Sequence, residues 1–93
     1  MNGATLRALE DTVRPVAITG ALTLEQAAAA VRLNRDIARF HAALAQVRHI
    51  VRLAGVVDER LRDEILARAV QLREAREALA RNLARHDDPE AHA

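Results

Sequence analysis

Apolar residues along the middle of this chain are spaced alternately three and four positions apart, and this spacing constrains the fold more than any other feature. Such a ladder forms the a/d seam of a heptad helix, and it fits a helix better than a strand. The middle of the chain is therefore predicted to be a helix that packs against another helix. The ladder consists of Ala30, Leu33, Ile37, Phe40, Leu44, Val47, Val51 and Ala54.

The ends of this helix are also marked in the sequence. Thr23 and Gln26 have the spacing of a capping box, and Leu22 occupies the position of a hydrophobic staple. Residues 24–54 contain no proline or glycine, and Gly55 lies where a glycine commonly ends a helix. The sequence thus predicts a long helix over residues 24–54.

Two further helices are predicted around it. A short helix over residues 4–14 is stopped by Pro15, because the residue before a proline avoids the helical conformation. A long helix over residues 58–86 begins with Asp58 as its N-cap and is followed by a frayed acidic tail, residues 87–93. The apolar stripe of this last helix is formed by Leu61, Ile65, Leu72, Leu79 and Leu83.

Together these elements predict a single all-α domain over residues 1–93. The connection between the long helices is so short that it favours an antiparallel hairpin, and the first helix is expected to pack across it. Phe40 is the only aromatic residue, so the core consists of smaller side chains that bury little area each. We therefore expect two hairpins to pair into a four-helix bundle-like dimer.

Composition narrows the cellular setting and the chemistry. The chain has no cysteine and no serine, which excludes disulfides and both of these nucleophiles. Its formal net charge is only +1, which as a whole does not indicate nucleic acid binding. No stretch is apolar and long enough for a membrane span, and no signal peptide is evident. A cytoplasmic bacterial protein is the expectation.

The leading functional prediction is a non-catalytic protein–protein interaction module, such as an adaptor, co-chaperone or assembly subunit. Its partner, another protein or a second copy of the chain, would bind the heptad seam as a helix in a groove. Phe40 is the expected hot spot, because it is the largest rigid side chain on the seam. The predicted partner-binding residues are Leu33, Ile37, Phe40, Leu44, Val47 and Val51.

An alternative is a small dimeric DNA-binding regulator. The segment LTLEQAAAAVRLNRDIARFH, residues 22–41, resembles the helix-turn-helix of winged-helix transcription regulators. The resemblance implies that Ala28 is tightly packed, that Leu33 is the buried residue of the turn, and that a recognition helix opens at Asn34 and Arg35. A break in the helix near residues 32–34 would support this alternative. The implied DNA-binding residues are Arg32, Asn34, Arg35 and Arg39.

No catalytic residue, cofactor site or metal site is predicted, and no small-molecule substrate is evident. His41 and His49 have no histidine or carboxylate three or four positions away, the spacing that metal ligands on a helix require. No acidic residue lies on the apolar stripe of the middle helix, so a buried catalytic pair of carboxylates is not expected there. The chain is accordingly predicted not to be an enzyme.

Overall fold

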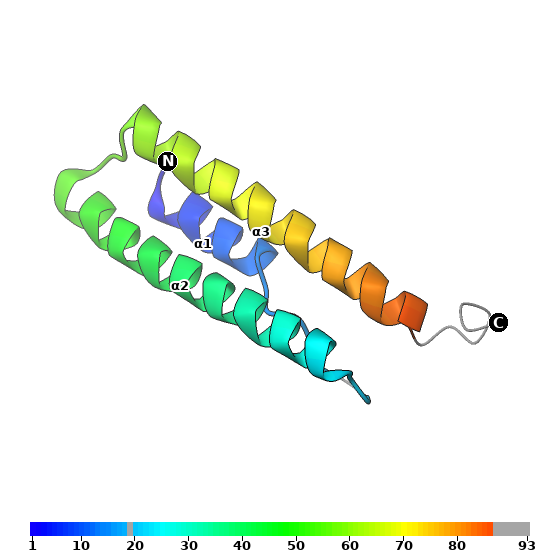
Figure 1. The fold of residues 1–93 in the computed structure, drawn as a ribbon. Helices are drawn as coiled ribbons and strands as arrows, with labels where there is room; N and C mark the ends of the chain where they lie inside the picture. The colour runs from blue at the N-terminus through cyan, green and yellow to red at the C-terminus, as the bar shows by residue number, and fades with distance from the viewer. Residues whose placement is uncertain (19, 87–93) are drawn as a thin grey trace.

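The chain folds into three α-helices. The computed structural model describes residues 1–18 and 20–86, and in these ranges it contains α1 (Gly3–Thr12), α2 (Leu24–Ala54) and α3 (Glu59–His86) but no strand. Both long helices extend from the connection at residues 55–58, and α1 lies between them in this view (Figure 1). The all-α prediction is confirmed. The predicted tail, residues 87–93, lies outside the described residues.

α2 has the bounds that its sequence signals predict. The Thr23 hydroxyl accepts a hydrogen bond from the backbone N–H of Gln26 at 3.1 Å, and the Gln26 side chain accepts one from the N–H of Thr23 at 3.0 Å. These two bonds form the reciprocal capping box. At the other end Gly55 has φ 84°, and its N–H donates to the Val51 carbonyl at 2.7 Å. A left-handed residue therefore ends the helix.

Replacing Gly55 with alanine is expected to destabilise the protein by about 1–2 kcal/mol, because an L-residue is strained in the left-handed region. No heavy atom lies within 4 Å of the Cβ that would be added, so the cost comes from the backbone alone. Chemical denaturation followed by circular dichroism measures it. Gly3→Ala is the matched control, because Gly3 lies within α1 without a positive φ and its added Cβ also meets nothing. An equal effect of both substitutions would contradict the explanation.

The other two helices begin at side-chain caps. α1 spans Gly3–Thr12 where 4–14 was predicted: Asn2 caps its start by accepting a hydrogen bond from the N–H of Thr5 at 2.9 Å. It ends two residues earlier because the N–H of Val13 bonds to the Glu10 carbonyl three residues back, which closes the last turn. α3 begins at Glu59. The preceding residue, Asp58, caps it by accepting a hydrogen bond from the N–H of Leu61 at 2.8 Å.

The core joins all three helices. The fully buried Leu6 and Val13 of the N-terminal segment pack with the α2 seam and with the α3 stripe. At one point the stripe is polar: the Arg76 Nε is buried and has no hydrogen-bond partner among the described residues. The buried apolar cluster contains Leu6, Val13, Ile37, Phe40, Leu44, Val47, Val57, Ile65, Ala69 and Leu72.

The molecule is a rod. Its principal extents are 57 × 18 × 17 Å, and its radius of gyration is 16.4 Å. A compact domain of this length would have a radius of gyration of about 12 Å. The rod therefore has a large lateral surface relative to its core. Within the described residues, none of the helices is both long and apolar enough to cross a membrane.

Candidate functional site

The predicted partner-binding residues lie in the core of the chain itself. Ile37 and Leu44 have 0% and 1% of their surface exposed, and Phe40 and Val47 have 7% and 8%. Leu33 and Val51 are half-buried against the same cluster. The seam is therefore filled by α1 and α3 of the same chain. A partner helix could occupy it only by displacing those elements.

A row of polar side chains beside the seam attaches the N-terminal segment to α2. The Arg48 guanidinium pairs with the Glu10 carboxylate at 2.5 Å. The His41 Nε2 lies 2.5 Å from the Val13 carbonyl. A carbonyl only accepts hydrogen bonds, so the Nε2 carries the proton and donates it. Asn34 is the third member of this row, and it contacts the backbone further along the N-terminal segment.

Asn34 binds both polar groups of one peptide unit. Its Oδ1 accepts a hydrogen bond from the N–H of Val16 at 2.7 Å, and its Nδ2 donates to the Val16 carbonyl at 3.2 Å. The row at positions 34, 41 and 48 has heptad spacing, and its contacts at 16, 13 and 10 show that the segment runs opposite to α2. The heptad spacing of these three polar residues is the one sign of the row in the sequence. It was not recognised there, and the contacts with the N-terminal segment were not predicted.

Asn34→Ala is expected to lower the free energy of unfolding by about 1–3 kcal/mol, because two half-buried backbone groups lose their hydrogen bonds. Hydrogen exchange at the Val16 amide should become faster in the same variant. The matched control is Gln46→Ala, which truncates an exposed amide on the same helix. If Asn34→Ala were no more destabilising than Gln46→Ala, the anchoring role of Asn34 would be refuted.

The alternative prediction of a helix-turn-helix is wrong as a structure. α2 is one continuous helix from Leu24 to Ala54, so there is no turn near residues 32–34. Ala28 is exposed where the resemblance implied tight packing, and Leu33 is half-buried within the helix. The physical reason is that the ladder requires an unbroken helix to keep its residues on one face.

The arginines implied in DNA binding are therefore residues of a helix surface. Arg32, Arg35 and Arg39 are all exposed on α2. Arg39 approaches Asp36 at 4.0 Å, one turn before it on the same helix. Asn34, the fourth residue of that set, is engaged with the backbone of Val16. The structure thus separates the set into three exposed cations and one internal anchor.

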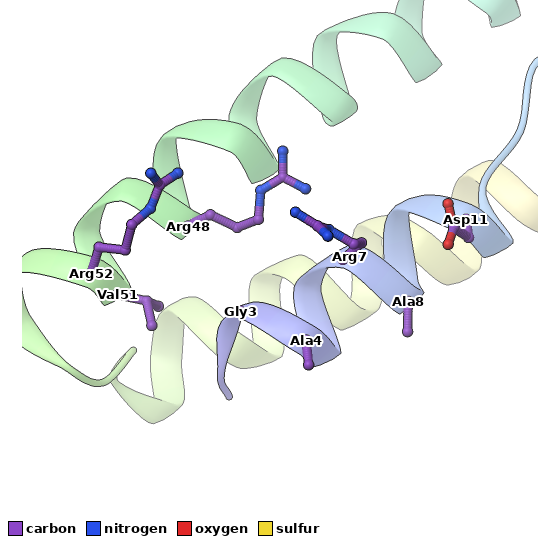
Figure 2. A pocket seen from close by; sticks show the side chains of 8 residues that line it. All are labelled: Gly3, Ala4, Arg7, Ala8, Asp11, Arg48, Val51 and Arg52. Atoms are coloured by element: carbon purple, nitrogen blue, oxygen red, sulfur yellow. The ribbon is translucent and has the colours of Figure 1, made fainter.

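An open groove lies between α1 and α2 near the start of α1. Its lining includes Arg7, Arg48 and Arg52, with one carboxylate, Asp11, toward the other end of α1. In Figure 2 the Arg7 and Arg48 side chains point toward each other across the groove. Of these three arginines, Arg48 is the one that forms an ion pair among the described residues, with Glu10. The groove therefore presents cationic groups of a kind that suits carboxylates or phosphates.

The histidines and carboxylates of the described residues do not gather into a site. His41 is bound to the Val13 carbonyl, and His49 is exposed on α2. Within residues 1–18 and 20–86, no three histidine or carboxylate side chains are grouped so that they could hold a metal ion.

Each long helix carries a second heptad row on the side away from the core. We call the row on α2 the α2 outer face and the row on α3 the α3 outer face. In both rows the residues are four and three positions apart, and every member is exposed. The α2 outer face consists of Leu24, Ala28, Val31, Arg35, Ala38, Ala42, Ala45 and His49, and the α3 outer face of Glu59, Asp63, Leu66, Val70, Arg73, Glu77, Ala80 and Ala84.

These outer faces combine apolar side chains with opposite charges. Six of the eight residues on the α2 outer face are apolar, and its charged member is Arg35. The α3 outer face has four apolar residues, three carboxylates and one arginine. Leu24 is 88% exposed and Val31 49% exposed, while Leu66 and Val70 are 41% and 42% exposed. Helical faces of this kind are suited to packing against another helix.

Comparisons with family models, curated proteins and solved structures give no match for this chain.

Proposed function

We propose that this chain is a non-catalytic helical protein–protein interaction module, an adaptor, co-chaperone or assembly subunit. In this proposal α2 and α3 form an antiparallel hairpin that α1 stabilises internally. The rigid rod then presents one long helix surface on each side. Its expected location is the cytoplasm.

One observation carries the proposal: α2 has two heptad rows, and the chain itself covers only one of them. Ile37 and Leu44 on the inner row are buried, whereas Leu24 and Val31 on the outer row are exposed. Exposing apolar side chains at regular spacing is unfavourable in water, and burial of that row against a partner would recover about 25 cal/mol per Å² of apolar area. The binding surface that we propose is therefore the α2 outer face in place of the seam.

The test compares the full chain with a Val31→Glu variant as bait in extracts of the source organism. Val31→Glu places a charge in the middle of the outer row, at a position whose side chain is half exposed, so the fold is expected to persist. Circular dichroism checks this. The matched control is Ile50→Glu, which charges a similarly exposed residue of α2 outside the row.

A protein retained by the full chain and by Ile50→Glu, but lost with Val31→Glu, would support the proposal. A second copy of the chain that binds to the bait also counts as a retained protein. If folded Val31→Glu retained the same proteins as the full chain, the α2 outer face would not be the binding surface. Retention on duplex DNA that disappears with Arg35→Ala and Arg39→Ala would instead indicate nucleic acid binding.

A further inference from the structure

We propose that the α2 outer face binds the α3 outer face of a second copy of this chain. This inference rests on the proposed function and names the partner of the proposed surface. The two faces lie on different helices, so the contact is between unlike surfaces. Three properties of the faces support it: the order of large and small side chains, the position of the charges, and the repulsion that each face has for itself.

The first property is the order of side-chain size. On the α2 outer face the large residues Leu24 and Val31 come first, and alanines follow from position 38 to 45. The α3 outer face has the same order, with Leu66 and Val70 before its two alanines. An antiparallel contact can therefore place Val31 near Ala80, and Leu66 and Val70 near Ala45 and Ala42. Close helix packing needs this alternation of large and small residues.

The second property is the position of the charges. The connection between α2 and α3 is centred on residues 56–57, so residues equally distant from it lie at the same level in two copies placed side by side. At this register Arg35 of one copy lies opposite Glu77 of the other. Ala42 lies opposite Val70 in the same alignment. A cation thus meets an anion where a small residue also meets a large one.

The third property is that neither face suits itself. Two α2 outer faces can bring Arg35 of both copies together, and no carboxylate belongs to that row. Two α3 outer faces would bring together Asp63 and Glu77 of both copies. Like charges at a contact are unfavourable. A contact between unlike faces leaves one face of each end copy free, so further copies can be added.

Cysteine cross-linking tests the geometry directly, because the chain has no cysteine of its own. One preparation carries Ala42→Cys and another carries Val70→Cys. We expect the oxidised mixture to form at least about five times more cross-linked dimer than either preparation alone, since facing Cβ atoms must approach within about 4.5 Å. A chain that carries both substitutions should form a series of cross-linked multimers on oxidation. Ala43→Cys mixed with Val70→Cys is the control, because Ala43 is exposed on α2 but outside the row.

Charge exchange tests the same contact in solution by sedimentation velocity. The unsubstituted chain should associate increasingly with concentration. Arg35→Glu alone and Glu77→Arg alone should each weaken association at least about tenfold, because each places like charges opposite each other. An equal mixture of the two variants should associate as the unsubstituted chain does, since every contact between them again pairs opposite charges.

Three results would overturn the inference: a chain that stays monomeric at all concentrations, cross-linking of Ala42→Cys with itself as efficient as in the mixture, or a mixture of charge variants that does not regain association. A monomeric chain that still retains a Val31-dependent partner would refute the second copy as occupant and leave the proposed function intact. A monomeric chain without such a partner would refute both.

Discussion

Phe40→Ala is expected to lower the free energy of unfolding by about 3–5 kcal/mol, the typical cost of emptying a buried aromatic site. Phe40 is 7% exposed and contributes the only aromatic ring of the chain. Its ring packs in the cluster that joins all three helices, so little of the cavity can be filled by other side chains. Urea denaturation followed by circular dichroism measures the loss.

Phe40→Leu is the matched control, because it keeps most of the volume and should cost less than about 1.5 kcal/mol. The two variants separate the loss of volume from the loss of an apolar residue. A loss below about 1 kcal/mol for Phe40→Ala would mean that the ring is not part of a packed core.

Leu6→Ala is the second substitution with a large expected effect, a loss of about 2–5 kcal/mol. Leu6 has no exposed surface, and it is the buried residue of a helix of only ten residues. A helix this short is marginal by itself, so its packing has to stabilise it. We therefore expect the amides of α1 to exchange hydrogen faster in this variant, in addition to the global loss of stability.

Leu53→Ala provides the comparison, because Leu53 is 76% exposed near the end of α2. The same side chain is removed from a solvent-exposed site, and the stability should change by less than about 0.5 kcal/mol. Equal losses for the two leucines would show that α1 does not depend on Leu6 for its attachment.

The bounds of the long helices could be predicted because their signals are local. A capping box needs only Thr23 and Gln26, and a left-handed helix end needs only Gly55. The start of α1 was harder to place, because Asn2 caps it by accepting hydrogen bonds from the N–H and the hydroxyl of Thr5 alone, without the reciprocal bond of a capping box. Its end depends on how Val13 bonds to Glu10, which Pro15 alone does not determine.

The candidate site was only partly accessible from the sequence. The seam was found from its spacing, but the spacing does not distinguish contacts within the chain from contacts with a partner. The row of Asn34, His41 and Arg48 consists of three different residue types, and its partners are separated from it by 18 to 38 residues. Those partners include backbone groups, which leave no mark in a sequence.

The sequence by itself determined that this protein is helical and where its long helices begin and end, because capping and heptad spacing act over a few residues. Only the tertiary structure decided which heptad row is internal. α1 and α3 fill the seam through Leu6, Val13 and the α3 stripe, because burying that row removes the most apolar area from water. The fold leaves the α2 outer face exposed to solvent. This face is the binding surface in the proposed function.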